Sequence, residues 1–393
     1  MQIADRLASI PFSGIRKILE AVDDLERKGR DVIRLEIGRP DFDTPAHIKA
    51  AAADALAAGK VHYSSNYGIL ELREAITRKL SKENGLSYDA SSEVIVTSGA
   101  VEAVAITMMG LLNPGDEILI PDPYWVSYGP CAQMAGAIPI SVPSRFADGF
   151  YPRIEDIEAR ITSKTRMLVI NSPHNPTGAV YGKDILDKLA RLAIKHNLYV
   201  LSDEIYERII YDGNEHISIG ALPNMRERTI TINGMSKIYS MTGWRLGYVA
   251  AEKSVIEALV RIRQNTTACA TTFAQWGGLE ALNGSQEEST NMVAEFERRR
   301  NFLFAALQKI PGLQVVKPGG AFYFLVSVEE LMQPAEQVAM YLLEEAGVAV
   351  VPGTAFGNYG EGLLRISYAN SYQNLVLAAA RMCAALEKCH AIS

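Results

Sequence analysis

The sequence predicts an α/β fold: a large domain with a mainly parallel, seven-stranded sheet between helices, plus a smaller α+β domain. One observation is a series of seven short apolar runs, at 94–97, 117–120, 138–142, 167–170, 198–201, 229–232 and 246–250. A second is that helical patterns separate several of these runs, notably at 100–112 and 184–196. Apolar strand runs that alternate with helices are typical of a parallel sheet covered on both faces.

The segment before the first of these runs has patterns of its own. Residues 13–30 have the period of an amphipathic helix, and residues 32–37 alternate as a short strand does. A turn-rich break at 38–45 follows them. Helical patterns over 46–58 and 69–82 then lead to the first strand of the sheet.

The last third of the chain predicts the smaller domain. Three helices are expected first, at 253–263, 271–283 and 286–309. Strand-like runs then mix with helical patterns: strands at 313–316, 321–326, 348–351 and 363–367, and helices at 334–346 and 371–388. We therefore expect a large domain over 46–285, and a small domain made of the N-terminal segment 1–45 together with 286–393.

Composition excludes several classes of function. The 393 residues include 39 Lys and Arg against 45 Asp and Glu, and the net charge of −6 lacks the basic footprint of a nucleic-acid binder. No run approaches the roughly 18 apolar residues of a membrane span, and the charged start of the chain does not resemble a signal peptide. The four cysteines and six histidines show no metal-ligand spacing. We expect a cytoplasmic protein with no metal site and neither nucleic-acid nor membrane partners.

Chemically active side chains follow the apolar runs. Ligands of open α/β sheets bind outside the carboxyl ends of the strands, and there the chain places Asp203, Lys237 and the turn Ser98-Gly99 before a helix. A lysine amine can form a Schiff base with an aldehyde, a carboxylate can keep a ring nitrogen protonated, and a helix N-terminus suits a phosphate. This combination predicts pyridoxal 5'-phosphate as cofactor.

The motifs that carry these residues resemble one enzyme family. Residues 236–247, Ser-Lys-Ile-Tyr-Ser-Met-Thr-Gly-Trp-Arg-Leu-Gly, are similar to the lysine signature of fold-type-I aminotransferases of class I/II. Further blocks resemble the family in the family's order: 63–73, 124–128, 171–178, 202–206, 318–323, 352–357 and 364–368. The resemblance runs from about Pro11 to the end and is greatest to the bacterial aspartate/aromatic branch.

The resemblance implies a set of cofactor-binding residues. In it Lys237 forms the Schiff base and moves the proton, Asp203 holds the pyridine nitrogen, and Tyr206 bonds the ring oxygen; these three are the expected catalytic residues. The full cofactor set is Ser98, Gly99, Ala100, Trp125, Asn175, Asp203, Tyr206, Ser236, Lys237, Arg245 and Tyr63.

The resemblance also implies how substrate and a second subunit take part. Arg365 is expected to grip the substrate α-carboxylate, with Gly38, Trp125 and Asn175 lining the same site. Tyr63 resembles a phosphate ligand donated by the neighbouring subunit. The expected partners are therefore an amino acid, a 2-oxo acid and a second copy of the chain, in a homodimer with shared active sites.

The implied activity is ping-pong transfer of an amino group from an L-amino acid to a 2-oxo acid, with aspartate or glutamate favoured and aromatic amino acids next. No arginine lies within 264–273, roughly where relatives of the animal type carry one for acidic substrates. Arg39 either binds a side-chain carboxylate or faces water, and the second interpretation is favoured.

Three alternative functions remain. A carbon–sulfur lyase, or another specialised enzyme with the same cofactor, would use the same Lys237 and Asp203. A ligand-sensing regulator on this fold is less favoured, because no helix-turn-helix pattern precedes Gly38. A nicotinamide dehydrogenase is poorly supported, because no Gly-x-Gly-x-x-Gly follows an early strand.

Overall fold

The computed structural model describes residues 3–4, 7–8, 10, 12 and 14–390. Its helices are α1 Ile15–Arg27, α2 Ala46–Ala57, α3 Leu70–Lys79, α4 Ala100–Leu111, α5 Tyr128–Met134, α6 Ile154–Glu158, α7 Lys183–Lys195, α8 Lys253–Arg263, α9 Thr272–Asn283, α10 Glu287–Leu307, α11 Ala335–Ala346 and α12 Tyr372–His390. Its strands are β1 Ile33–Arg34, β2 Val94–Thr97, β3 Glu117–Asp122, β4 Ile138–Pro143, β5 Thr165–Asn171, β6 Tyr199–Asp203, β7 Thr229–Gly234, β8 Gly247–Ala250, β9 Gln314–Val315, β10 Tyr323–Ser327, β11 Val348–Ala349, β12 Val351–Pro352 and β13 Leu363–Ser367.

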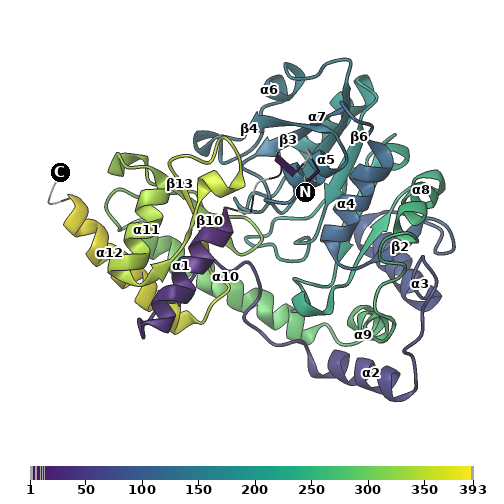
Figure 1. Ribbon diagram of the computed structural model, residues 1–393, viewed down its shortest axis with the longest axis horizontal. Helices are drawn as coiled ribbons and strands as arrows, with labels where there is room; N and C mark the ends of the chain where they lie inside the picture. Colours follow the sequence, from purple (N-terminus) through teal and green to yellow (C-terminus); the bar gives the residue numbers. More distant parts are fainter. Residues whose placement is uncertain (1–2, 5–6, 9, 11, 13, 391–393) are drawn as a thin grey trace.

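The large sheet has seven strands in the order β2-β8-β7-β6-β5-β3-β4 (Figure 1). Strand β8 runs antiparallel to both of its neighbours, and all other neighbouring strands are parallel. The mainly parallel, seven-stranded sheet predicted from the sequence is therefore confirmed. Its parallel strands β5, β6 and β7 end side by side, which brings the residues that follow them to one edge of the sheet.

Helices cover both faces of this sheet, as the continuous apolar runs predict. Within β5, Met167 and Val169 pack in a core with side chains of α4, α5 and α8, whereas Leu168 and Ile170 pack with α7 on the opposite face. Successive strand residues point to opposite faces, so a strand buried on both sides is apolar throughout. This explains why these strands are visible in the sequence.

A second, antiparallel sheet has the order β12-β13-β10-β9, and it lies with α10, α11 and α12 in the C-terminal part (Figure 1). The N-terminal segment joins it: β1 pairs in parallel with β11, and the Ser367 amide donates to the Leu35 carbonyl at 2.8 Å. Helix α1 therefore lies beside the C-terminal elements, although it is far from them in sequence. The division into 46–285 against 1–45 with 286–393 stays a prediction.

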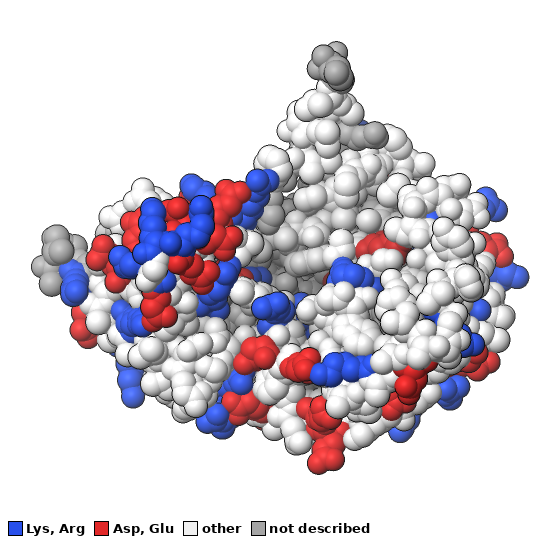
Figure 2. All heavy atoms as spheres, turned by 60° about the horizontal axis from the view of Figure 1, so that its bottom comes forward, with Lys and Arg blue, Asp and Glu red and all other residues white. Residues whose placement is uncertain are grey.

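The structure differs from the sequence-based elements mainly in length. The strand expected over 32–37 is only two residues, β1, because the chain beyond Leu35 leaves the pairing and enters a cavity wall. Helices α5 and α6 were not predicted, since seven and five residues are too few to show a helical period. The surface is hollowed near the centre of the face in Figure 2, and charged side chains gather to the left of and below that hollow, whereas the wall above it is mostly uncharged. Within the described residues, no helix is both long and apolar enough to cross a bilayer.

Candidate active site

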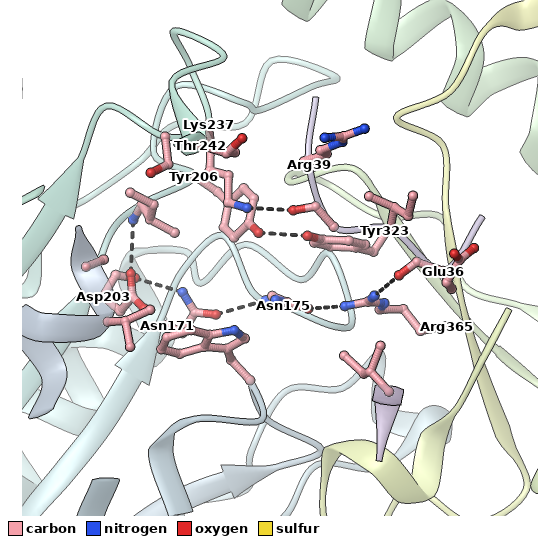
Figure 3. Close-up of a pocket in the computed structure, with 18 of the residues that line it drawn as sticks. Glu36, Arg39, Asn171, Asn175, Asp203, Tyr206, Lys237, Thr242, Tyr323 and Arg365 are labelled. Atoms are coloured by element: carbon pink, nitrogen blue, oxygen red, sulfur yellow. Dashed lines mark hydrogen bonds between the residues drawn. The ribbon is translucent and has the colours of Figure 1, made fainter. Parts of the chain in front are cut away.

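A cavity of about 400 Å³ lies where strands β5, β6 and β7 end, and the second sheet and the N-terminal segment close its other side (Figure 3). Ten residues predicted for the site line it: Gly38, Ala100, Trp125, Asn175, Asp203, Tyr206, Ser236, Lys237, Arg245 and Arg365. These come from parts of the chain up to 327 residues apart, so the fold itself assembles the site.

Three predicted residues are not in the cavity wall. Gly99 lies directly behind it, against the guanidinium of Arg245. The backbone amide of Ser98 donates to the Glu102 carboxylate. Tyr63 is 90% exposed and far more accessible than a residue that acts within its own subunit's cavity. Its predicted role in a neighbouring subunit's site stays a prediction.

Lys237 follows strand β7 and reaches back across the cavity. Its Nζ donates to the carbonyl oxygen of Gly38 at 2.6 Å. Burial lowers the pKa of Lys237 to about 8, and the positive charge of Arg365 acts in the same direction. A lysine with this pKa is partly neutral at physiological pH, and only the neutral amine is a nucleophile and a base.

Asp203 ends strand β6 as a buried carboxylate, only 3% exposed. The Tyr128 hydroxyl donates to its Oδ2 at 2.6 Å, and the Ile205 amide donates to its Oδ1 at 3.2 Å. Burial nevertheless raises the pKa of Asp203 to about 6. At pH 7 and above, the carboxylate is therefore mostly ionised in an environment that favours a cationic partner.

A chain of hydrogen bonds crosses the cavity floor from Asp203 to Arg365 (Figure 3). The Asn171 side-chain amide donates to the Asp203 carbonyl at 2.9 Å, and the Asn175 backbone amide donates to Asn171 Oδ1 at 2.9 Å. Arg365 Nη1 then donates to Asn175 Oδ1 at 3.4 Å. This network connects the backbone of Asp203 at one end of the cavity to the guanidinium of Arg365 at the other.

Arg365 comes from β13 and is almost fully buried. Its Nη2 donates to the Glu36 carbonyl at 2.6 Å, and its guanidinium lies over the rings of Tyr323 and Phe356 at 4.6 and 4.7 Å. Its Nε has no hydrogen-bond partner among the described residues. A buried guanidinium with a free donor is suited to a carboxylate ligand.

Arg245 lies against the N-terminus of α4. Its Nη1 donates to the Thr242 carbonyl at 2.9 Å. Gly99, which precedes α4, has φ +83°, and a Cβ there would lie 2.5 Å from Nη2 of Arg245. Only glycine permits both this backbone conformation and this close approach. The guanidinium and the free amides of the helix N-terminus together form a cradle for an anion such as a phosphate.

Tyr206 and Tyr323 form a buried pair whose hydroxyl oxygens are 2.9 Å apart. Burial raises the pKa of both phenols above the ordinary value, so both keep their protons and one donates to the other. Sequence reasoning assigned no role to Tyr323, although it ends a recognised block at 318–323. It also missed Tyr128 and Asn171, which lie within recognised blocks, and Glu36, for which no signal exists.

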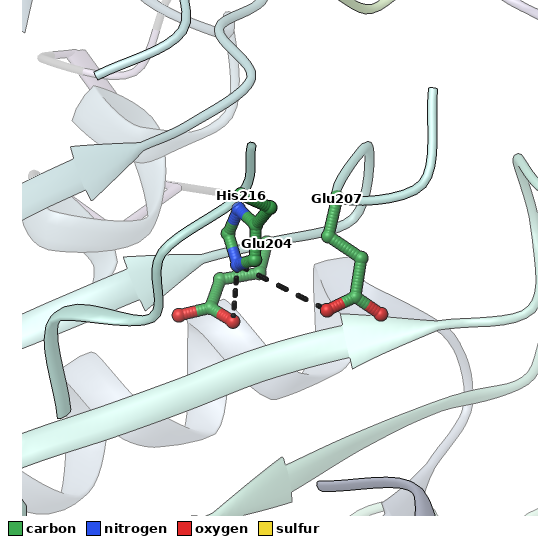
Figure 4. Close-up of side chains that lie close together, drawn as sticks. All are labelled: Glu204, Glu207 and His216. Atoms are coloured by element: carbon green, nitrogen blue, oxygen red, sulfur yellow. Dashed lines mark hydrogen bonds and ion pairs between the residues drawn. The ribbon is translucent and has the colours of Figure 1, made fainter. Parts of the chain in front are cut away.

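A separate cluster brings Glu204, Glu207 and His216 together beside the site (Figure 4). His216 Nε2 lies 2.9 Å from Glu204 and 3.9 Å from Glu207. Lys79 pairs with Glu207 and donates to Asn84 at 2.7 Å. Burial lowers the pKa of His216, but the two carboxylates outweigh burial and raise it. Lys79 and His216 thus face the two carboxylates, and we regard the cluster as an internal ion network.

Comparison with known proteins decides the family. The family model described as aminotransferase class I and II matches residues 30–382. The chain is also 43% identical to aromatic-amino-acid aminotransferase 2 of Thermococcus litoralis, over 97% of each chain. It is 46% identical to the aspartate/prephenate aminotransferase of Thermus thermophilus, over 90% of each. The chain belongs to the class I and II aminotransferases.

Solved structures agree with this assignment. The aspartate aminotransferase of Thermus thermophilus with maleate has a TM-score of 0.93 and 42% identity, with 98% of this chain and 100% of that chain covered. The aromatic aminotransferase of Pyrococcus horikoshii has a TM-score of 0.90 and 44% identity, with 93% and 99% covered. The resemblance found in the motifs is confirmed, and the protein is a transaminase.

Proposed function

We propose that this aminotransferase holds pyridoxal 5'-phosphate in the cavity and moves the amino group of an L-amino acid to a 2-oxo acid. The observation that carries the proposal is that one cavity contains the amine of Lys237, with a lowered pKa, the buried carboxylate of Asp203 and the buried guanidinium of Arg365. An amine nucleophile, a partner for a ring nitrogen and a carboxylate clamp are the groups that this chemistry requires.

The residues present fit this cofactor. Among the described residues, Asp203 has no cationic group at ion-pair distance, so a protonated ring nitrogen would complete its environment. The cradle of Gly99 and Arg245, with Ser236 in the wall, suits the phosphate. In the proposal, Lys237 would bond to the aldehyde, and Tyr206 and Asn175 would form hydrogen bonds with the ring oxygen. Ala100 would contact the phosphate, and Trp125 would stack on the ring face.

The mechanism follows from these positions. When bound, the cofactor supplies an electron sink that stabilises negative charge at the substrate α-carbon. Arg365 binds the α-carboxylate and, with Trp125, orients the substrate so that its α-hydrogen faces Lys237. Once the substrate's amino group had replaced Lys237 on the cofactor's aldehyde carbon, the freed neutral Nζ of Lys237 would accept this proton and return it to that aldehyde carbon. With the cofactor bound, the Asp203 carboxylate would hold the ring nitrogen in its protonated form. The second substrate, a 2-oxo acid, uses the same cavity in reverse, which gives ping-pong kinetics.

A second subunit completes the proposed site. Tyr63 is 90% exposed, and the resemblance assigns it to the phosphate of the neighbouring subunit's cofactor. Val61 and Leu70 near it in sequence are 54% and 46% exposed, an apolar surface that association would cover. We therefore propose a homodimer with shared active sites.

The substrate assignment keeps acidic amino acids first and aromatic amino acids next. The similar proteins carry aspartate, aromatic and prephenate aminotransferase names, which supports both choices. The test is an assay of the purified protein with the cofactor, single L-amino acids and 2-oxoglutarate, with both products measured by liquid chromatography. Equal amounts of new amino acid and new oxo acid are expected. Lys237→Ala should abolish the transfer, whereas Lys188→Ala, an exposed lysine on α7, should not. Release of ammonia and pyruvate in place of transfer would favour the lyase.

A further inference from the structure

The charged side chains in the cavity wall are unequal in number. Four are basic and two are acidic: Arg39, Lys237, Arg245 and Arg365 against Glu36 and Asp203. The Glu36 carboxylate is already paired, because Arg34 Nε donates to its Oε1 at 2.9 Å from outside the cavity. The cavity therefore has an excess of positive charge, and anionic groups of its ligands must balance it.

Three of the four cations have a function under the proposed mechanism. Lys237 carries the reacting amine, Arg245 lies in the phosphate cradle and Arg365 binds the α-carboxylate. The phosphate of the cofactor and the α-carboxylate, which every amino acid has, therefore each have a cationic partner in the cavity. Arg39 is left without an anionic partner.

Arg39 is free to bind a ligand. Arg39 directly follows Gly38 in the sequence, and the carbonyl of Gly38 accepts a hydrogen bond from Nζ of Lys237. Arg39 is therefore the next residue after one that contacts the reacting amine (Figure 3). Its side chain is exposed at the cavity, and it makes no hydrogen bond or ion pair with any residue that the structure describes. The side chain is exposed, as the sequence favoured, and the structure also places it in the cavity wall.

Among the described lining residues with neither an assigned role nor an ion-pair partner, Arg39 is the one that carries a positive charge. The others are apolar or neutral, and they include Ile15 and Leu19 of α1, Ile37, Val101 and Thr242. We propose that Arg39 binds the side-chain carboxylate of dicarboxylic substrates and so determines the enzyme's activity toward acidic amino acids. This inference rests on the proposed function of the cavity and extends it to substrate selection.

The proposed role makes a selective prediction. A guanidinium pairs with a carboxylate through two parallel hydrogen bonds, and a neutral side chain gains nothing from it. Loss of Arg39 should therefore weaken the binding of acidic substrates and leave the binding of neutral substrates unchanged. Because the distal carboxylate takes no part in bond breaking, the loss should appear mainly in KM, with kcat little changed.

The experiment compares Arg39→Gln and Arg39→Lys with Arg191→Gln, an exposed arginine on α7 outside the cavity. The first measurement is kcat/KM for L-aspartate and for L-phenylalanine with a fixed oxo acid. Arg39→Gln should lower the value for aspartate by about tenfold or more, equivalent to about 1.4 kcal/mol, and leave phenylalanine within about twofold. Arg39→Lys should retain part of the activity, and Arg191→Gln should match the wild type.

A binding measurement separates this inference from the proposed reaction. Calorimetric titration of the holoenzyme with succinate, a dicarboxylate without an amino group, should show about tenfold weaker binding in Arg39→Gln. Hydrocinnamate, a monocarboxylate with a phenyl ring, should bind equally to both proteins. Equal losses for aspartate and phenylalanine, or no loss for either, would overturn the role of Arg39. Failure of the wild type to transaminate any amino acid would instead refute the proposed function, while the succinate titration would still test Arg39.

Discussion

Replacement of Asp203 by Asn should stabilise the cofactor-free protein while it removes the carboxylate that the proposed cofactor requires. The rise of the Asp203 pKa from 3.8 to about 6 corresponds to roughly 3 kcal/mol, because one pKa unit is worth about 1.4 kcal/mol. Asn has nearly the same shape and no charge. The two oxygens of the Asp203 carboxylate accept hydrogen bonds from the Tyr128 hydroxyl and the Ile205 amide, whereas Asn has only one side-chain oxygen. One of these hydrogen bonds is therefore weakened, at a cost of about 1 kcal/mol. The expected net gain is about 1–2 kcal/mol above pH 7.

The pH dependence gives this prediction its sign. Below pH 3.8 Asp203 is protonated in both the folded and the unfolded protein, so its ionisation does not affect stability. Between pH 3.8 and about 6 the folded state binds more protons than the unfolded state. The free energy of unfolding of the wild type therefore falls as pH rises through this window and then levels off. Asp203→Asn lacks this contribution, so its advantage should grow from pH 5 to pH 8.

The assay is urea denaturation of both proteins without cofactor at pH 5, 6 and 8, followed by circular dichroism. Asp54→Asn, at an exposed position on α2, is the control and should show no comparable change with pH. Addition of pyridoxal phosphate should then stabilise the wild type more than Asp203→Asn. An Asp203→Asn protein that is less stable than the wild type at pH 8, or a difference that does not grow with pH, would refute the reasoning.

Three further predictions test other parts of the site. Gly99→Ala should weaken cofactor binding about tenfold or more in equilibrium dialysis, because the new Cβ would displace Arg245. The control is Gly182→Ala, whose new Cβ meets open space and should leave the affinity unchanged. Equal affinities in the two variants would contradict the phosphate cradle. In urea titrations, His216→Gln should lower the free energy of unfolding more at pH 6 than at pH 9. The reason is that the stabilisation associated with the raised pKa of His216 is lost as pH rises through that pKa. A loss of stability that does not depend on pH would contradict the ion network. Arg365→Lys should raise KM about 10- to 100-fold for acidic and aromatic amino acids alike in steady-state kinetics, and a loss confined to one class would contradict the α-carboxylate role.

Much of the fold could be predicted because the strands of the large sheet are buried on both faces. Strand β5, Thr165–Asn171, has only Arg166 exposed, and such a strand is a continuous apolar run that sequence alone reveals. The two-residue strands β1 and β11 could not be given correct bounds, since their length depends on where the N-terminal segment leaves the C-terminal part. Helix α6 escaped notice because five residues do not complete two turns.

The site was predictable to a similar degree and for a related reason. Asp203 ends one strand and Lys237 follows the adjacent parallel strand, and the carboxyl ends of such strands meet at one edge. Of the residues that reach the cavity from the N-terminal segment and the second sheet, Gly38 and Arg365 were identified only through the resemblance of their motifs to the family. Tyr323, Glu36 and Arg39 face the cavity only because those parts pack against the end of the large sheet. No local pattern in the sequence records that packing.

The central claim is that Lys237 and the bound cofactor carry out amino transfer, and a half-reaction tests it most directly. The absorption spectrum of the holoenzyme is recorded before and after addition of single amino acids, with no oxo acid present. We predict that aspartate or glutamate converts the bound pyridoxal form to the pyridoxamine form, with one 2-oxo acid released per active site and no ammonia. A spectrum that persists with every amino acid tried, or continuous release of ammonia and pyruvate, would contradict the account.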